Sequence, residues 1–339
     1  METNFEVVYH RGAGFTKQAL PAAPSLAADQ ARIRPLQVGI CGSDLFLLEG
    51  SAPTLRLGHE WVGKVEAVGA DVTDVQVGNL VTGTGHFSCG HCAECLQGDS
   101  NLCADSVHFS SDQIGALRSG FEAPAQQLVI LPNAFHRGQV LHEILAVGEQ
   151  AVALLADLSL AKTQAQVLIF GAGPIGISIA LALQSEGAST LLVEKYAERV
   201  MMARKLGLNA MTLAEALLRT EMQNRSAVLV DASNDYSGDA GGFRLLTHFA
   251  GRKFVALIVG KYKGAQTLTS EYNRRAGQLR WMRGVSLSVL QKSVSKWDAK
   301  LEGLAEHLIS HVYDLESTNQ AFAMARDKRQ SLKVVLSCS

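Results

Sequence analysis

Residues 166–176 read QVLIFGAGPIG. The first five letters form a short apolar run typical of a buried strand, and the last six fit the pattern G-x-G-x-x-G. A strand that leads through closely spaced glycines into a helix can hold the pyrophosphate of a dinucleotide at the positive end of the helix dipole. The residues predicted to form this site are Gly171, Gly173, Pro174, Ile175 and Gly176.

Beyond this stretch the sequence continues as alternating strands and helices. Apolar runs at residues 190–194, 227–231 and 254–259 predict further strands, and residues 197–206 predict a helix that ends at Gly207. Buried strands that alternate with helices form a parallel, doubly wound sheet. The sequence therefore predicts a Rossmann-type α/β domain.

The end of the second predicted strand bears on the choice of dinucleotide. Glu194 lies about 20 residues beyond the glycine pattern, where a carboxylate can accept hydrogen bonds from the adenosine ribose hydroxyls. The same carboxylate would repel the 2′-phosphate of NADP(H), so we expect NAD(H) to be favoured. Lys195 and Arg199 carry positive charge nearby and would soften that preference.

The amino-terminal part of the chain has a different texture. Short alternating runs broken by glycine, such as WVGKVEAVG at residues 61–69, predict a β-rich domain that extends to about residue 148. Near the carboxyl end, the sequence predicts helices at residues 297–309 and 317–327 and a closing strand at residues 333–336. We therefore expect an α/β protein in which a β-rich domain accompanies the dinucleotide domain.

The composition is that of a well-packed globular protein, with 47 % hydrophobic and 19 % charged residues in a chain of 339 residues. Such a length exceeds one ordinary core and suits two domains. The formal net charge of -1 argues against nucleic acid or an anionic membrane as a partner, because both require a basic surface. The sequence begins without the basic and apolar segments of a signal peptide, so we expect a cytoplasmic protein.

Four of the six cysteines crowd into a lobe at about residues 86–105, with the spacing C-x2-C-x2-C-x7-C. They are Cys89, Cys92, Cys95 and Cys103. Four thiolates at such spacing can close a tetrahedron around a structural zinc ion. The bacterial ferredoxin pattern would place the fourth cysteine after three residues and follow it with proline. Here the gap is seven residues and Ala104 follows, so we predict zinc.

Two further residues have side chains suited to a catalytic zinc ion. Cys41 lies in VGICGSD at residues 38–44, and His59 lies in LGHE at residues 57–60. A catalytic zinc needs three protein ligands and one open position. A lone buried cysteine or histidine is more often an ordinary core residue, so the prediction depends on the combination of motifs rather than on either residue.

In order and spacing, these motifs resemble the zinc-dependent medium-chain dehydrogenase/reductase family, which includes the alcohol dehydrogenases, and most closely its sorbitol/polyol and threonine branch. The similarity runs from about residue 34 to residue 207 and resumes at the carboxyl end. The resemblance implies a GroES-like catalytic domain at residues 1–148, a Rossmann domain at residues 149–287, and a return to the catalytic domain at residues 288–339. It also implies two zinc ions per chain, NAD(H), an alcohol or polyol substrate, and a homodimer or homotetramer.

The resemblance assigns a role to each residue of the catalytic motifs. Cys41 and His59 would bind the catalytic zinc, and Glu60 would be a direct or intermittent ligand. Asp44 would hold His59 through its second ring nitrogen, as carboxylates behind metal-bound histidines do. Ser43 would bind the substrate hydroxyl and accept its proton.

The third protein ligand of this family is a glutamate in the polyol branch, and two candidates exist. Glu149 is closer to the expected distance before Gly171, whereas Glu143, in EILAV, matches the local motif text. We favour Glu149, although Gln150 replaces the proline that usually follows. Many relatives also carry a histidine that relays the proton, and Phe46 occupies that position here.

Two alternative functions stay open at this point. One keeps the fold and loses the metal chemistry, as in the zinc-free NAD(P)H enone reductases. The other is a non-catalytic protein that retains only its dinucleotide site. The pair of Cys41 and His59 favours a zinc-dependent dehydrogenase that interconverts a secondary alcohol or polyol and its ketone.

Overall fold

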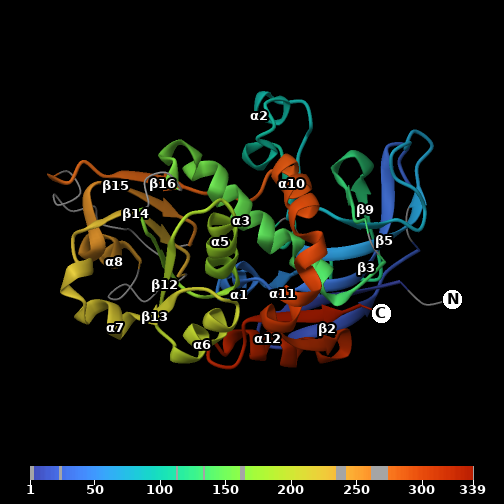
Figure 1. Ribbon diagram of the computed structural model, residues 1–339. Coiled ribbons are helices and arrows are strands. Elements are labelled where there is room, and N and C mark those ends of the chain that lie inside the picture. Colours follow the sequence, from blue (N-terminus) through green and yellow to red (C-terminus); the bar gives the residue numbers. More distant parts are fainter. Residues whose placement is uncertain are drawn as a thin grey trace. The chain divides into compact units, whose positions relative to one another are not determined.

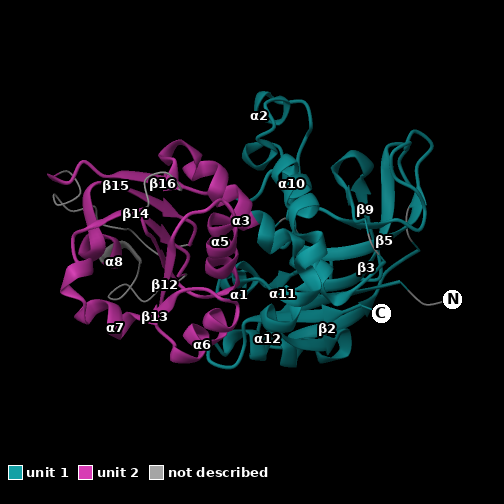
Figure 2. Ribbon diagram, in the orientation of Figure 1, with its two compact units in different colours: residues 1–146, 284–339 teal, residues 147–283 magenta. Residues whose placement is uncertain are grey.

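The structure is a computed structural model. It describes residues 4–22, 25–111, 114–132, 134–160, 165–233, 242–260 and 274–338 (Figure 1). The chain divides into two compact units, which Figure 2 shows in separate colours. Unit 1 consists of Met1–Ala146 and Gly284–Ser339, and unit 2 of Val147–Arg283. The two ends of the chain therefore contribute to the same unit.

Unit 2 contains a six-stranded sheet in which every neighbouring pair is parallel. Its strands are β11 (Val167–Phe170), β12 (Thr190–Glu194), β13 (Ala210–Thr212), β14 (Ser226–Asp231), β15 (Ala250–Ile258) and β16 (Gln278–Trp281). The order β13-β12-β11-β14-β15-β16 reverses direction at β11. Open α/β sheets bind nucleotides at this point. The predicted doubly wound sheet is confirmed.

Helices cover this sheet where the sequence is apolar and end where glycine permits a turn. They are α5 (Pro174–Ser185), α6 (Ala197–Lys205), α7 (Leu213–Leu218) and α8 (Gly242–Phe249). Gly187 and Gly207 follow α5 and α6 with φ of 82° and 74°, the left-handed conformation of a helix C-cap. Behind the sheet, the rings of Phe170 and Phe249 pack 5.6 Å apart in a continuous apolar core.

Unit 1 is built on a larger, mainly antiparallel sheet in the order β10-β6-β5-β3-β18-β17, with β9 also paired to β3. Its strands are β3 (Gln30–Gly39), β5 (Glu60–Val68), β6 (Leu80–Thr82), β9 (Phe121–Pro124), β10 (Val129–Ile130), β17 (Ile309–Asp314) and β18 (Lys333–Ser337). The register places Gly39 opposite both Glu60 and Val335. The carboxyl-terminal strand β18 thus lies beside β3, on the side opposite β5.

Smaller elements complete unit 1. A three-stranded sheet is formed by β1 (Phe5–His10), β2 (Gly14–Ala19) and β4 (Thr54–Leu55), and a hairpin by β7 (His86–Phe87) and β8 (Val107–His108). The helices are α1 (Gly42–Leu48), α2 (Ala93–Leu96), α10 (Leu287–Trp297), α11 (Leu301–Leu308) and α12 (Thr318–Arg326), while α3 (His142–Leu155) starts in unit 1 and continues into unit 2. The helix predicted at residues 297–309 corresponds to the shorter α11, and α10, which was not predicted, precedes it.

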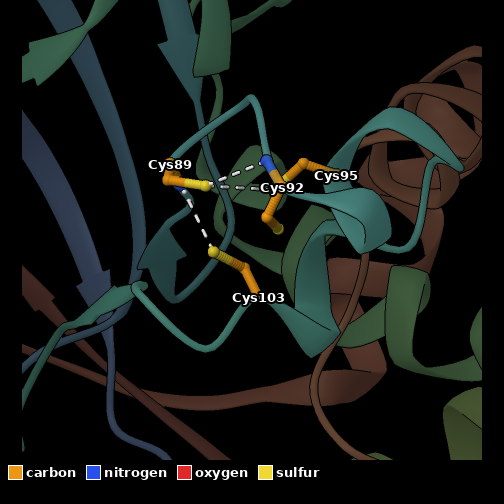
Figure 3. A group of neighbouring side chains, drawn as sticks. All are labelled: Cys89, Cys92, Cys95 and Cys103. Carbon is orange, nitrogen blue, oxygen red and sulfur yellow. Dashed lines mark hydrogen bonds between the residues drawn. The ribbon is translucent and has the colours of Figure 1, made fainter.

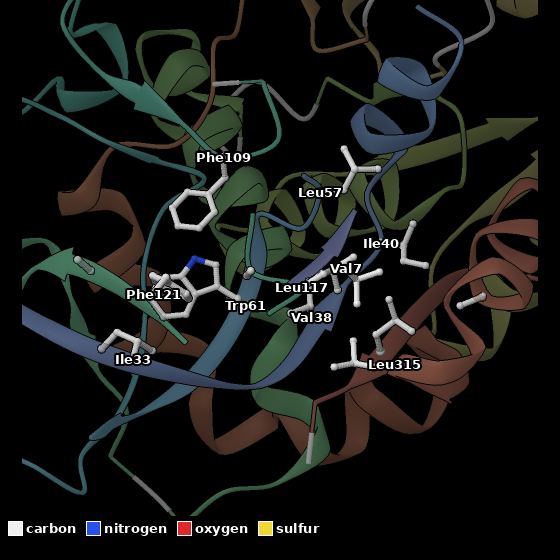
Figure 4. Packing of buried hydrophobic residues seen from close by; sticks show 14 of the residues in the cluster. Val7, Ile33, Val38, Ile40, Leu57, Trp61, Phe109, Leu117, Phe121 and Leu315 are labelled. Atoms are coloured by element: carbon white, nitrogen blue, oxygen red, sulfur yellow. The ribbon is translucent and has the colours of Figure 1, made fainter. Parts of the chain in front are cut away.

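The core of unit 1 is centred on Trp61, which is 1 % exposed (Figure 4). Its ring packs edge-on against Phe121 at 5.1 Å, and Phe109 packs edge-on against the same phenylalanine at 5.4 Å. Aromatic pairs in this geometry add to the stabilisation from burial. Residues 59 and 60 precede Trp61 directly, so this core fixes the start of β5.

One helical stretch, residues 137–158, is long and apolar enough to cross a membrane by length and composition. In the structure, however, 67 % of its apolar window is buried inside the protein. About two thirds of this window therefore packs against other residues of the protein.

Candidate metal centres and nucleotide-binding turn

The structure brings together three predicted ligands of the catalytic metal. Cys41 follows β3 and caps the amino end of α1, while His59 and Glu60 stand where β5 begins. The ligand atoms of the three residues all lie within 4.8 Å of one another. A thiol, an imidazole and a carboxylate at this separation can share one cation, and sulfur with nitrogen suits zinc.

His59 is held by the buried carboxylate of Asp44. Nδ1 of His59 lies 3.1 Å from Oδ1 of Asp44, and the backbone N–H of Cys41 donates to the other carboxylate oxygen at 3.0 Å. Burial alone would lower the pKa of His59, but the charges of Asp44 and Cys41 and the hydrogen bonds to them together outweigh burial and hold that pKa well above its usual range. Because Asp44 occupies Nδ1, the other nitrogen, Nε2, remains for the metal.

Ser43 stands beside that second nitrogen. Its hydroxyl oxygen lies 3.2 Å from Nε2 of His59, in the first turn of α1. A hydroxyl at this place is within reach of a molecule bound to a metal at Cys41 and His59. Phe46 follows three residues later on the same short helix and offers no group that could carry a proton.

Glu60 is fully buried and pairs with a lysine that the sequence analysis did not single out. Lys333, the first residue of β18, donates to Oε2 of Glu60 at 2.5 Å and to the carbonyl of Ile40 at 3.0 Å. The other oxygen of Glu60, Oε1, has no hydrogen-bond partner. A buried carboxylate oxygen without a partner is costly, and coordination of a cation would remove that cost. The donor set therefore fits a metal ion.

Two glutamates are candidates for the third protein ligand, and Glu143 is the one close to Glu60. Burial and then the charge of Glu60 raise the pKa of Glu143 to about 7, so the two carboxylates are near enough to repel each other. Glu149 lies six residues further along α3, in unit 2, and neither glutamate is among the converging ligand atoms of Cys41, His59 and Glu60. In the sequence, the distance before Gly171 favours Glu149, whereas the local match to the motif favours Glu143.

The four lobe cysteines form a second candidate metal centre, and Figure 3 shows their side chains turned toward one another. Their sulfur atoms all lie within 4.8 Å of one another, and those of Cys89 and Cys95 are 4.0 Å apart. Zinc–sulfur bonds of about 2.3 Å in a tetrahedron separate the sulfurs by roughly 3.8 Å. The backbone N–H groups of His91 and Cys92 lower the pKa of the Cys89 thiol to about 6, which favours the thiolate.

The glycine-rich turn has the geometry that the sequence predicts for a phosphate site. Gly171 has a φ of 98°, and a Cβ there would lie 2.8 Å from the carbonyl oxygen of Ala232. A Cβ on Gly176 would collide with the carbonyl of Gly171, so strand and helix can approach only with glycine. Pro174 opens α5 directly after Gly173, which leaves the helix amino end directed at the turn.

Charged residues frame this turn. Glu194 is 6 % exposed, and its two carboxylate oxygens accept the backbone N–H groups of Ala172 at 2.7 Å and Tyr196 at 3.0 Å. Each oxygen retains a lone pair for a ribose hydroxyl. The guanidinium of Arg199 reaches the turn, because a Cβ on Gly173 would lie 3.2 Å from its Nη1. Lys195 projects from the surface next to Glu194.

Comparison with known proteins is consistent with this geometry. The alcohol dehydrogenase GroES-like domain family matches residues 27–133. L-threonine 3-dehydrogenase from Streptomyces coelicolor is 33 % identical over 193 residues, which cover 54 % of this chain and 55 % of that protein. The enzyme of the same name from Solibacter usitatus is 30 % identical over 65 % of this chain and 67 % of its own length. The chain belongs to the zinc-dependent medium-chain dehydrogenase/reductase family. The alignments with these two relatives thus span 55 % to 67 % of their lengths.

Solved structures show the fold of this dehydrogenase family over the whole chain. Galactitol-1-phosphate dehydrogenase from Escherichia coli superposes with a TM-score of 0.83 at 22 % identity, covering 98 % of this chain and 100 % of that one. A family described as an FAD binding domain matches residues 164–240. Flavin and nicotinamide dinucleotides share an ADP half, and the G-x-G-x-x-G turn binds that half in both classes of protein.

Proposed function

We propose that this chain is a zinc-dependent NAD(H) oxidoreductase that interconverts a secondary alcohol or polyol and its ketone. The observation that carries the proposal is the convergence of Cys41, His59 and Glu60 beside the hydroxyl of Ser43. The relatives support it, because the 3-hydroxyl named in L-threonine 3-dehydrogenase is a secondary alcohol. L-Threonine therefore belongs among the substrates to be tested.

Cys41 and His59 would hold the zinc, and a carboxylate would complete the ligand set. When bound, zinc would supply Lewis acidity that lowers the pKa of a substrate hydroxyl, and NAD would supply the hydride acceptor. Ser43 would orient that hydroxyl and take its proton. Asp44 keeps His59 in the tautomer and orientation that ligation needs. Because Phe46 cannot relay the proton, the proton would leave through ordered water or a cofactor hydroxyl.

The remaining assignments follow from the same family and from unit 2. Glu194 at the end of β12 supports NAD(H) over NADP(H), with Arg199 and Lys195 as the opposing charges. We infer two zinc ions per chain, one at Cys41 and His59 and one at the lobe cysteines. We also propose that the protein is cytoplasmic and forms a homodimer or homotetramer. Its substrate would be a small molecule.

The Cys41→Ser variant tests the proposal, with Cys338→Ser as a matched control at a cysteine outside both groups. We expect the wild-type protein to contain two zincs and Cys41→Ser to contain one. Oxidation of alcohols, polyols or L-threonine with NAD should fall to background in Cys41→Ser alone, while NADH binding, followed by fluorescence, stays unchanged. Activity that survives with the site's zinc content intact would refute the assignment.

A further inference from the structure

Ser110 is a buried residue that the motifs do not include, yet it contacts Asp44, the carboxylate that holds His59. Its side chain is 2 % exposed, and its hydroxyl donates to Oδ1 of Asp44 at 2.8 Å. The same hydroxyl oxygen lies 3.4 Å from Nδ1 of His59. Ser110 therefore donates to Oδ1 of Asp44, the same carboxylate oxygen that contacts Nδ1 of His59.

The backbone at Ser110 adopts a conformation that serine rarely takes. Its φ is 70°, in the left-handed region, where the Cβ of any residue but glycine is crowded. Neighbouring contacts enforce it: the N–H of Ser110 donates to Ile114 at 2.6 Å, and the N–H of Phe109 donates to Gly85 at 3.0 Å. Phe109 is itself buried in the core of unit 1. Strain that the surroundings over-determine in this way is typical of functional sites.

Glycine at position 110 would remove this backbone strain, but it has no hydroxyl to donate to Asp44. The hydroxyl completes the hydrogen bonds of Asp44, which is fully buried and accepts from Cys41, His59 and Ser110. A buried carboxylate that lost one donor could rotate, and His59 would then lose its fixed orientation.

We propose that Ser110 is a positioning residue of the Cys41 and His59 metal site. Its left-handed backbone brings the hydroxyl onto Asp44, and this contact fixes the His59 ring with Nε2 directed at the metal. The inference rests on the proposed function, since it names a further residue of that same site. It assigns Ser110 no contact with substrate or metal.

Two variants separate the hydroxyl from the backbone. Ser110→Ala and Ser110→Gly both remove the hydroxyl, but only glycine also releases the left-handed strain. We expect the zinc affinity of the Cys41 and His59 site, measured by chelator competition, to fall about 10- to 100-fold in both variants. The melting temperature should nevertheless be higher for Ser110→Gly than for Ser110→Ala. Zinc at the lobe cysteines serves as the internal reference and should not change.

Ser159 offers a matched control, because it is an exposed serine with a φ of 48° in unit 2. Ser159→Gly should relax its backbone and leave zinc affinity and kcat at wild-type values. If Ser110→Gly recovers wild-type zinc affinity and kcat while Ser110→Ala does not, the residue is only structural and the inference is overturned. Wild-type affinity in both variants also overturns it. A wild-type protein with only one zinc instead refutes the proposed function.

Discussion

Asp44 determines the electrostatics of the candidate metal site. Burial raises the pKa of this carboxyl, but the charge of His59 and the three hydrogen bonds from His59, Cys41 and Ser110 together outweigh burial and lower it. Asp44 is therefore an anion that stabilises positive charge on the imidazole behind it. A proton and a zinc ion both bring that charge, so they compete for the same nitrogen of His59.

Glu143 and Glu149 can be distinguished by experiment. Burial and then repulsion from Glu60 raise the pKa of Glu143, and a divalent cation between the two carboxylates would relieve the repulsion. We therefore expect Glu143→Gln to weaken zinc binding at the Cys41 and His59 site by at least about tenfold. Glu149→Gln, on the same helix, should stay within about twofold of wild type in the same chelator competition. The opposite pattern would make Glu149 the ligand, as its spacing before Gly171 suggests.

The strands β3, β5 and β18 assemble the site from three distant parts of the chain. Antiparallel pairing sets Gly39 against Glu60 on one side and against Val335 on the other. This register carries Lys333 to Glu60 across 273 positions of sequence. Burial lowers the pKa of Lys333, but the charge of Glu60 and its neighbours outweighs burial and raises it. The lysine therefore stays charged.

Replacing Lys333 by methionine tests this pairing. The change leaves the Glu60 carboxylate buried without its counter-charge, which typically costs about 3–5 kcal/mol of unfolding free energy. We expect a loss of that order for Lys333→Met in urea unfolding. The double variant Lys333→Met/Glu60→Gln removes both charges and should recover most of the loss. Equal unfolding free energies of the single and the double variant would contradict the prediction, because the loss would then not come from the unpaired charge of Glu60.

Local patterns in the sequence predicted much of the fold, because strands, helices and tight turns depend on neighbours. The strand 190–194 lies where the alternation placed it, and the glycine turn leads into α5 as predicted. The missed helix α10 has a local signal, since the hydroxyl of Ser286 accepts from Val289 at 3.4 Å as an N-cap. The predicted helix instead began at Trp297, where α10 ends.

The site residues that the sequence analysis missed act over long distances. Ser110 contacts Asp44 across 66 positions, and Lys333 contacts Glu60 across 273. Neither lies in a recognisable motif, and a serine or lysine by itself indicates no chemistry. The preference for Glu149 over Glu143 stays a prediction, because spacing to Gly171 does not determine which turn of α3 approaches the other ligands.

Each unit of the molecule has its own apolar core and its own candidate site. The metal ligands Cys41, His59 and the lobe cysteines all belong to unit 1, and the glycine-rich turn with Glu194 belongs to unit 2. Zinc and NADH should therefore stabilise different parts of the chain. Binding to the native state protects the element that forms the site, by about 2.7 kcal/mol at a ligand concentration 100 times Kd.

Hydrogen exchange with and without these ligands tests that division. Chelation of zinc should speed amide exchange in the cysteine lobe and around residues 38–61, because the thiolates and the buried Glu60 carboxylate would lose their shared cation. Exchange in β11, β12 and α5 should not change on chelation, whereas NADH should slow it there and leave the cysteine lobe unaffected. The cysteine lobe is the sharper half of this test, because its α2 has no buried residue and we therefore expect a bound ion to contribute most of its order. Equal loss of protection in both units on chelation would mean that they unfold as one cooperative body.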